Sequence, residues 1–493
     1  MASSPDYDPN QYGTIRDESL RAQVEADVQA ELEKRQGEKA EGKTDEEIYQ
    51  EAVNAATGTA QNKQWRSQAV NDTYEPGSTF KALVLAAALE EGVVSESDTF
   101  YCPGYYMVEG WPKPISCSKK APGHGTQTLA EAVQNSCNPA FMQIGQRLGI
   151  EKFYEYFQAF GLTEPTNIDL NGEGVSTVWP LNTMTGVDLA VGSFGQRFTV
   201  TPIQMITAFA ATINGGKLLQ PYVVQTVTAA DGTVVENTEP TVVRQVVSQE
   251  TSDKCREILT SVVMAEKGTG KNARQAGYTI GGKTGTSETT VPGEVVVSFM
   301  CFAPADDPQY IMLLTMDTPS RNTGTAVYGG TMVAPTASQI MGEILPALGI
   351  EPDYSAEELS GADAAVPYVV GKTAEEAKAA LKSAGFTYRT VGSGETVTDQ
   401  TPAGGAIVPN NASVVLYLGA EKSDTPSTVP DVTGKTPTEA NKALTNAGLI
   451  MKVAGATSAS GGSVTAISQS AEAGSQLPAG SVVTVRFGVR TTD

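Results

Sequence analysis

The C-terminal part of the chain contains the same sequence pattern twice. The segment VPYVVGKTAEEAKAALKSAGF begins at Val366 and matches VPDVTGKTPTEANKALTNAGL, which begins at Val429, a period of 63 residues. In each copy a Gly-Lys-Thr turn precedes Ala and Leu residues that recur every three or four positions, which predicts a helix ending at Ala-Gly, followed by two or three strands. Tandem copies predict two small α+β domains, at residues 366–419 and 429–488, with linkers at 351–365 and 420–428.

The first 350 residues have a different pattern. The whole chain has 493 residues, of which 40% are hydrophobic and 18% charged, values typical of a globular protein with about three domains. From about residue 62, helical segments alternate with strand-like runs. The runs EVVVSFMCFAPA and QYIMLLTMD are separated by Asp306-Asp307-Pro308, which predicts an antiparallel hairpin. The expected fold class for residues 1–350 is α/β (α+β), with antiparallel strands late in the sequence.

Residues 15–60 stand apart because they are dense in Glu, Lys, Gln and Ala. This composition predicts one or two exposed helices with a break near Gly37 to Gly42. A solvated insertion packed on one side is the favoured interpretation, and an acidic docking surface is the alternative.

The composition argues against several classes of function. A formal charge of −22 is unfavourable for a nucleic-acid partner, which requires a basic stripe. The single histidine, His124, excludes a zinc site with several His ligands and would have to serve any Ser–His–Asp triad. The five cysteines contain no C-x-x-C pair, so we expect neither a thiolate metal site nor thioredoxin-like redox chemistry. Nothing in the sequence implies a metal or an organic cofactor. The sequence has no apolar stretch of about 18 residues and no secretory signal at its start.

Ser78 and Lys81 are the first candidate catalytic pair. In YEPGSTFKALVLAAALEEG, Pro76 and Gly77 break the chain and good helix formers follow, so we expect a helix from Ser78. Residues three apart lie on one face of a helix. A serine hydroxyl is a weak nucleophile until a base removes its proton. A lysine can be that base when an apolar surrounding or a second cation lowers its pKa.

Two later segments supply candidate partners for this pair. TIGGKTGTSE places Lys283 after two glycines in a strand-like setting, where small residues let a substrate backbone lie close. The Lys and Thr side chains there could hold a carboxylate. QNSCNPAFM offers Ser136 and Asn138, a hydroxyl and an amide suited to relaying a proton and holding a peptide carbonyl.

The three segments read S-x-x-K, S-x-N and K-T-G in that order, which is the pattern of penicillin-recognising serine acyltransferases. Each motif alone is a weak signal. S-x-x-K recurs from Ser116 to Lys119 without a helix to carry it, and S-x-N recurs from Ser320 to Asn322 after K-T-G, out of order. The ordered set is therefore the specific signal.

At these residues the chain resembles the transpeptidase domain of class B penicillin-binding proteins. YEPGSTFK, NSCNPAFM, VTPIQMITAFAATINGG and GGKTGTSE are similar to family segments, and the likeness runs from residue 1 to about 348. It implies an antiparallel sheet flanked by helices plus a helical subdomain. The two repeats resemble PASTA modules, and the combination resembles the Gram-positive division and sporulation branches.

The resemblance implies a chemical role for each matching residue. Ser78 attacks the penultimate D-alanine carbonyl of a peptidoglycan stem peptide, with Lys81 as general base. Ser136 and Asn138 shuttle the proton and bind the acyl amide. A β-lactam mimics the substrate and stays as an ester on Ser78.

The resemblance also implies the substrate-binding strand. Lys283, Thr284 and Thr286, with Gly285 between the two threonines, engage the terminal carboxylate. The backbone N–H groups of Ser78 and Thr286 form the oxyanion hole.

Members of the family that this chain resembles carry a membrane anchor, a pedestal domain and an opening strand pair, which this sequence does not show. We therefore expect a sheet that lacks its first strands and exposes an edge. The expected location is the extracytoplasmic face of the cytoplasmic membrane. Expected partners are peptidoglycan, β-lactams, membrane-bound glycan-synthesis enzymes and divisome or sporulation proteins.

Some local features leave alternatives open. Cys102 and Cys117 either close a disulfide in an extracytoplasmic setting or stay free, while Cys137 is interpreted as a small buried filler and His124 as structural. Glu164 in LTEPTNIDL superficially resembles the deacylating glutamate of class A β-lactamases. The equivalent penicillin-binding-protein segment is the better match, which implies slow deacylation.

The leading hypothesis is a D,D-transpeptidase that cross-links peptidoglycan. A D,D-carboxypeptidase would differ only in using water as acceptor. A non-catalytic wall-binding or β-lactam-sensing protein is the alternative from another class. For the two PASTA-like domains, wall binding and a spacer or subunit-contact role are equally compatible with the sequence.

Overall fold

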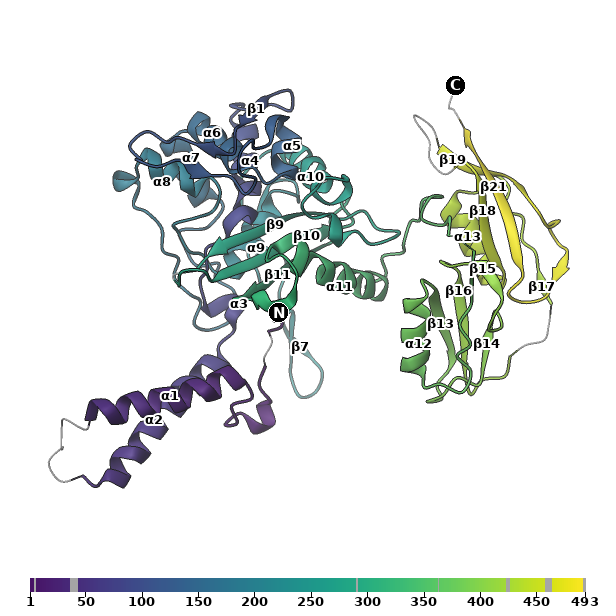
Figure 1. Cartoon of the computed structure of the whole chain (residues 1–493), viewed down its shortest axis with the longest axis horizontal. Helices are drawn as coiled ribbons and strands as arrows, with labels where there is room; N and C mark the ends of the chain where they lie inside the picture. The colour runs from purple at the N-terminus through teal and green to yellow at the C-terminus, as the bar shows by residue number, and fades with distance from the viewer. Residues whose placement is uncertain are drawn as a thin grey trace. The chain divides into compact units, whose positions relative to one another are not determined.

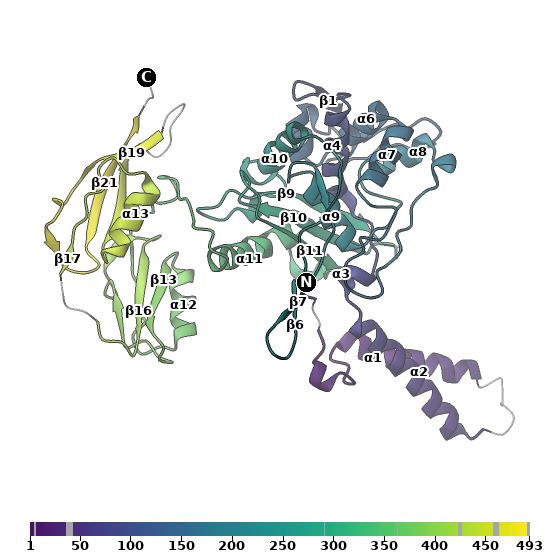
Figure 2. The same ribbon diagram turned by 180° about the vertical axis from the view of Figure 1, so that it is seen from behind.

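The computed structural model describes residues 1–3, 6–35, 43–289, 291–361, 363–422, 426–456 and 463–490. The chain divides into two compact units, of which the first holds residues 1–274 and 279–339 and the second holds residues 275–278 and 340–493 (Figure 1; Figure 2). All three motif segments lie in the first unit and both repeats lie in the second. Helices and strands occur in both units, which confirms the predicted α/β (α+β) class.

The first unit contains a three-stranded antiparallel sheet in the order β11-β10-β9 (Figure 1). Its strands are β9 (Gly281–Glu288), β10 (Val295–Ala303) and β11 (Tyr310–Asp317). Residues 297–303 of the central strand are all buried, as expected for an apolar strand covered on both faces. Ala303 pairs with Tyr310 across the connection, so the predicted antiparallel hairpin is confirmed. In the part of the chain that the structure describes, β11 pairs only with β10.

Helices cover this sheet and enclose the main core. Helix α10 contacts β9, α9 contacts β11, and α4 packs against α6 and α10. The buried rings of Phe80, Phe141, Phe209 and Phe302 belong to one continuous apolar cluster. The helices of this unit are α1 (Glu18–Arg35), α2 (Asp45–Trp65), α3 (Gln68–Asn71), α4 (Lys81–Glu90), α5 (Leu129–Gln134), α6 (Asn138–Leu148), α7 (Ile150–Ala159), α8 (Gly186–Gly192), α9 (Pro202–Ala211), α10 (Gln249–Met264) and the start of α11 (Ala334–Ala347).

Short strands form four further two-stranded sheets in the first unit, which pair β1 with β4, β2 with β3, β5 with β8 and β6 with β7. The first two pairs lie between α4 and α6 in the sequence and shape the loops beside the second motif. Their bounds are β1 (Thr99–Cys102), β2 (Tyr105–Tyr106), β3 (Ile115–Ser116), β4 (Gly125–Thr128), β5 (Lys217–Leu219), β6 (Thr226–Thr228), β7 (Val234–Asn237) and β8 (Val242–Gln245).

The acidic segment near the N-terminus forms the paired helices α1 and α2 (Figure 1). Thr44 and Glu47 make a capping box that begins α2, because each satisfies a free backbone N–H of the other. Val28, Ala52 and Ala56 are buried between the helices and form a small apolar cluster of their own. The predicted break near Gly37 to Gly42 falls outside the described residues.

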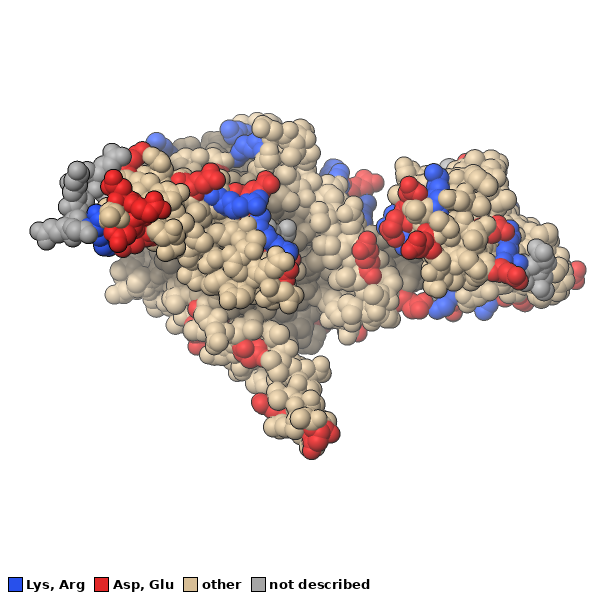
Figure 3. Space-filling model, turned by 90° about the horizontal axis from the view of Figure 1, so that it is seen from below, with Lys and Arg blue, Asp and Glu red and all other residues tan. Residues whose placement is uncertain are grey.

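Figure 3 shows the charged side chains on one face of the molecule. On the face drawn in Figure 3, acidic side chains lie scattered among uncharged ones, and the basic side chains of the described residues form no continuous stripe.

The two repeats in the second unit have the same topology. In each, a helix is followed by a three-stranded sheet whose middle strand pairs in parallel with the first and antiparallel with the other: β13-β16-β14 and β18-β21-β19. Their elements are β12 (Asp363–Ala365), α12 (Ala374–Ser383), β13 (Thr387–Gly392), β14 (Asp399–Thr401), β15 (Ile407–Pro409) and β16 (Ser413–Leu418), then β17 (Ser427–Thr428), α13 (Pro437–Asn446), β18 (Ile450–Gly455), β19 (Ser463–Gln469), β20 (Gln476–Leu477) and β21 (Val482–Arg490).

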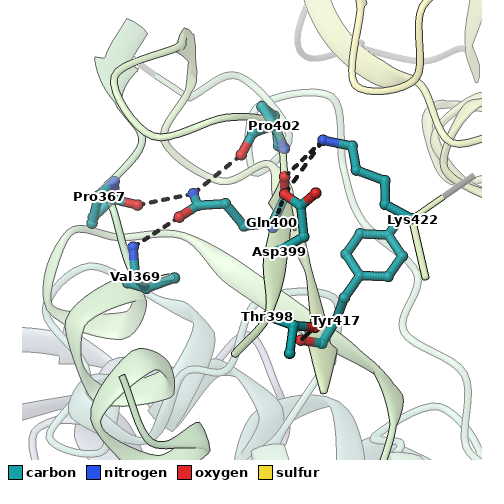
Figure 4. Close-up of polar contacts among 8 residues, drawn as sticks. All are labelled: Pro367, Val369, Thr398, Asp399, Gln400, Pro402, Tyr417 and Lys422. Atoms are coloured by element: carbon teal, nitrogen blue, oxygen red, sulfur yellow. Dashed lines mark hydrogen bonds and ion pairs between the residues drawn. The ribbon is translucent and has the colours of Figure 1, made fainter. Parts of the chain in front are cut away.

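A glutamine that satisfies backbone groups recurs in both repeats. Gln400 accepts a hydrogen bond from the Val369 N–H at 2.8 Å and donates to the carbonyls of Pro367 and Pro402 (Figure 4). Gln469 makes the equivalent bonds in the second copy, where its Oε1 accepts from the Val432 N–H at 2.8 Å. A polar side chain placed inside each repeat therefore fixes the loop that leads into the helix.

The segment predicted as a linker at 351–365 is packed where the structure describes it. Leu359 is buried in the same cluster as Val432 and Leu444 of the second repeat. The Thr438 hydroxyl donates to the Asp353 carboxylate at 2.7 Å. Apolar residues between the domains thus add to the core of the second repeat, a contact between distant segments that local composition does not reveal.

Candidate active site

Ser78 lies in a 3₁₀ turn (Gly77–Phe80), and Lys81 is the first residue of α4. The sequence predicted a helix from Ser78 onward. The turn is tighter because the Lys81 N–H donates to the carbonyls of both Ser78 and Thr79. Residues i and i+3 eclipse in a 3₁₀ turn, so the two side chains still face the same way. Ser78 is partly exposed and Lys81 is fully buried.

The Lys81 amine is held by the second motif. Its Nζ lies 2.7 Å from the Ser136 carbonyl, 2.7 Å from Asn138 Oδ1 and 3.2 Å from Ser136 Oγ. The Phe141 ring lies below it, 5.3 Å from Nζ to the ring centre. Burial lowers the pKa of Lys81 to about 7, although the sulfurs of two nearby cysteines act in the opposite direction. Near neutral pH a large fraction of this amine is therefore uncharged.

Ser136 lies in a sharp turn between α5 and α6. A capping box at Thr128 begins α5, and Pro139 occupies the first turn of α6, a position where its missing N–H costs nothing. Between these helices Ser136 has a φ of +51°, a left-handed conformation that costs a non-glycine residue on the order of 1–3 kcal/mol. Strain at this position fits a hydroxyl that must point toward the lysines.

Lys283 reaches the same hydroxyl from β9, where the sequence predicted a strand. Its Nζ lies 2.8 Å from Ser136 Oγ and 3.1 Å from the Thr284 carbonyl. Lys283 is fully buried. Burial, followed by the charge of Lys81, lowers its pKa well below the ordinary value.

Close backbone packing brings β9 against the serine turn. A Cβ on Gly285 would lie 2.2 Å from Ser298 Oγ and 3.1 Å from Thr79 Cγ2, and a Cβ on Gly77 would lie 2.9 Å from the Thr286 carbonyl. Only glycines permit this approach. The structure therefore brings the Ser78 turn, the Ser136–Asn138 turn and the 283–286 strand together.

Thr269 is a site residue that the sequence analysis missed. It follows α10 and its hydroxyl lies 3.0 Å from Thr284 Oγ1. A Cβ on Gly330 would lie 2.2 Å from the Thr269 carbonyl, so a second glycine contact fixes this loop. In the sequence the Gly268-Thr269-Gly270 triplet indicates only a turn, so local sequence does not reveal this contact.

The sequence analysis left open whether Cys102 and Cys117 form a disulfide. All five are free, so the disulfide considered for Cys102 and Cys117 is not formed. Both cysteines lie beside Cys137 and His124. The sulfur atoms and an imidazole nitrogen of these four residues lie within 4.8 Å of one another, although their sequence spacing contains no C-x-x-C pair.

Glu164 is engaged away from the lysines. Its carboxylate forms an ion pair with Arg244, and its carbonyl accepts from Gln204 Nε2 at 2.9 Å. The Thr166 N–H and hydroxyl bond instead to Glu173. This pairing agrees with the interpretation that the segment is not a deacylating loop.

The helices of the described residues include none that is both long and apolar enough to cross a membrane.

Comparison with known proteins agrees with this geometry. Residues 1–342 match the penicillin binding protein transpeptidase domain, and residues 364–420 and 427–489 each match the PASTA domain. Stage V sporulation protein D of Bacillus subtilis is 40% identical over 370 residues, which are 72% of this chain and 55% of that protein.

Two solved structures are also similar. The D,D-transpeptidase domain of a peptidoglycan glycosyltransferase from Eggerthella lenta matches with a TM-score of 0.54 and 26% identity, over 62% of this chain and 72% of that chain. Penicillin binding protein 3 of Mycobacterium tuberculosis, complexed with aztreonam, matches with a TM-score of 0.54 and 28% identity, over 60% and 67%. The chain spans about half the length of the curated relatives it matches. It belongs to the penicillin-binding protein transpeptidase family and carries two PASTA domains.

Proposed function

We propose that this chain is a serine D,D-transpeptidase that cross-links peptidoglycan through an acyl ester on Ser78. The observation that carries the proposal is the buried Lys81 amine, held 2.7 Å from two oxygen acceptors and beside a relay hydroxyl. A serine near an uncharged lysine has the base it needs for nucleophilic attack.

The hydrogen-bond count shows why Lys81 suits this role. An uncharged amine has two N–H donors and one lone pair. The Ser136 carbonyl and Asn138 Oδ1 accept hydrogen bonds and take both N–H groups. The lone pair is left for a hydroxyl proton: the Ser136 hydroxyl lies 3.2 Å from the amine, and Ser78 supplies its own proton during attack.

Each step can be written with its proton accounted for. Ser78 Oγ bonds to the penultimate D-alanine carbonyl carbon while Lys81 takes the hydroxyl proton. The bond to the terminal D-alanine then breaks, and the proton passes by way of Ser136 to the leaving amine. In the second half an acceptor amine loses its proton to Lys81, attacks the ester and restores the Ser78 hydroxyl.

The strand β9 supplies the substrate-binding part of the proposal. Lys283, Thr284 and Thr286 engage the terminal carboxylate, and the N–H groups of Ser78 and Thr286 hold the developing oxyanion. A β-lactam would form the same ester, which agrees with the aztreonam complex of the Mycobacterium tuberculosis relative.

We expect the enzyme to act outside the cytoplasmic membrane, where the proposed substrate is cross-linked. Its partners would be membrane-bound glycan-synthesis proteins of sporulation or division, as the name of the Bacillus subtilis relative suggests.

Labelling with a fluorescent penicillin tests the proposal. The wild-type chain and Ser320→Ala, a change at an exposed serine of the out-of-order S-x-N match, should label equally, and Ser78→Ala should not label. Incubation of a D-Ala-D-Ala peptide with an amine acceptor then separates transfer from hydrolysis. A folded wild type without label would favour a non-catalytic wall binder, and hydrolysis without transfer would favour a carboxypeptidase.

A further inference from the structure

Arg197 has a backbone conformation that is unfavourable for its residue type. Its φ is +68°, in the left-handed region where any residue other than glycine is strained. The guanidinium pairs with Asp188 at 3.2 Å, and the Arg197 side chain remains 53% exposed. An ion pair with one exposed member contributes little stability, less than the strain costs. The contact with Asp188 therefore does not by itself account for an arginine at this position.

The loop that carries Arg197 lies against the residues that precede Ser78. The Gly77 N–H donates to the Gly195 carbonyl at 2.9 Å, and a Cβ on Gly195 would lie 1.9 Å from the Gly77 carbonyl. The Arg197 N–H donates to Glu75 Oε1 at 2.9 Å. The left-handed residue is therefore bonded directly to the segment that leads into the serine turn.

Glu288, the last residue of β9, lies near the same segment. A Cβ on Gly77 would lie 2.9 Å from the Thr286 carbonyl, two residues before Glu288. Because side chains alternate along a strand, Glu288 lies on the side of β9 that carries Thr286. Burial raises the pKa of Glu75, the Arg197 N–H lowers it, and the nearby charge of Glu288 raises it again. The exposed Glu288 and the Arg197 loop are thus both close to Glu75.

The direction of the donor peptide along β9 follows from the proposed function, on which this inference rests. The terminal carboxylate is bound from Lys283 onward, and the scissile carbonyl lies at the Thr286 N–H. The donor residue before the penultimate D-alanine then lies about 3.3 Å further along the strand, toward Glu288. We propose that Arg197 and Glu288 form a subsite for a donor side chain that carries both a carboxylate and an ammonium group.

The charges of this subsite match such a side chain. A guanidinium presents N–H groups in a fork that fits a carboxylate. Among the described residues the Arg197 guanidinium pairs with Asp188 through Nη1, and other N–H groups remain for a ligand. The Glu288 carboxylate can accept hydrogen bonds from an ammonium group. Asp188, Glu75 and Glu288 would repel a side chain that carried a carboxylate alone, which favours a ligand with both charges.

Four synthetic donor peptides that end in D-Ala-D-Ala test the subsite. The preceding residue carries a side chain that ends in both charged groups, in the carboxylate alone, in the ammonium alone, or in neither. Acylation is measured with the full chain as release of the terminal D-alanine at a fixed concentration of amine acceptor. For the wild type, kcat/KM of the doubly charged peptide should exceed that of the uncharged peptide at least about tenfold.

Variants assign each charge to its residue. Arg197→Gly should remove the preference for the carboxylate, and Glu288→Gln should remove the preference for the ammonium group. Arg197→Lys keeps a positive charge and should keep part of the first preference. Arg66→Ala removes another half-exposed arginine that pairs with an aspartate and should keep both preferences. Arg197→Gly should also be at least as stable as the wild type in chemical denaturation, because glycine adopts this φ without strain.

The ratio between the peptides separates binding from a structural role. A variant that slows all four peptides by the same factor would show that its residue only supports the fold, and would overturn the subsite. Equal rates of the wild type for all four peptides would overturn it as well. A folded wild type that neither releases D-alanine nor labels with penicillin would contradict the proposed function. The affinities of that chain for the four peptides, measured by calorimetry, would then still decide the subsite.

Discussion

The amine of Lys283 lies 2.8 Å from the hydroxyl of Ser136, although the two residues are 147 positions apart in the sequence. The same hydroxyl lies 3.2 Å from the Lys81 amine. Two buried ammonium groups sharing one hydroxyl would repel each other strongly in a low-dielectric surrounding. Burial lowers the pKa of both lysines, so the arrangement favours at least one uncharged amine beside Ser136.

Replacing Lys81 with arginine should abolish acylation while keeping a positive side chain at the site. A guanidinium stays protonated at any pH the protein tolerates, so it cannot accept the serine proton. We expect the labelling rate with fluorescent penicillin to fall by about 10²–10⁴-fold. Lys254→Arg in α10, where the half-buried Lys254 pairs with Glu250, is the matched control. Labelling of Lys81→Arg at the control rate would exclude Lys81 as the base.

The rate of acylation should rise with pH and level off near neutrality. Lys81 must be uncharged to accept a proton, and its pKa is lowered to about 7. Below that pH the protonated fraction grows, so the second-order rate with a β-lactam should fall about tenfold per pH unit. Stopped-flow measurements from acid to mildly alkaline pH would show the inflection. A rate that begins to rise only near the ordinary pKa of lysine would contradict the assignment.

Local sequence predicted those parts of the site that depend on spacing. The sequence itself shows the three-residue interval between Ser78 and Lys81 and the small residues around Lys283. The left-handed turn at Ser136 and the contact of Thr269 with Thr284 were not visible, because both depend on how segments far apart in sequence pack.

The cysteine cluster was missed for a related reason. No spacing motif links Cys102, Cys117, His124 and Cys137, because they come from four different segments and meet only in the fold. The fold class and the repeats were predictable because both depend on patterns that recur along the sequence, of apolar residues in helices and strands and of whole segments in the repeats. Single residues that meet only in the folded chain leave no such pattern in one sequence.

Ser136→Ala and Ser136→Gly should separate strain from chemistry. Glycine adopts a φ of +51° without a steric cost and alanine does not, so the glycine variant should be more stable by about 1 kcal/mol in chemical denaturation. Both variants lack the relay hydroxyl and should acylate more slowly than wild type by a similar factor. If the glycine variant were less stable than the alanine variant, the turn would not be strained.

Gly285→Ala should loosen the contact between β9 and the serine turn. Its Cβ would lie 2.2 Å from Ser298 Oγ, and such overpacking typically costs about 1–3 kcal/mol. We expect reduced stability and slower penicillin labelling. Gly58→Ala in α2 is the control, because a Cβ there meets nothing within 4 Å and alanine favours a helix by about 1 kcal/mol. Wild-type stability and labelling of Gly285→Ala would show that β9 can move away.

The acyl-enzyme formed with a β-lactam should persist, and Glu164 should have no part in its lifetime. A deacylating glutamate must hold a water molecule against the ester, but the Glu164 carboxylate is paired with Arg244. Intact-protein mass spectrometry should show a Ser78 adduct that outlasts the excess β-lactam, and nitrocefin should be consumed once per active site without turnover. Glu164→Gln should leave the adduct lifetime unchanged. A longer lifetime in that variant, or steady nitrocefin hydrolysis by the wild type, would assign the loop a hydrolytic role and make the chain a β-lactamase.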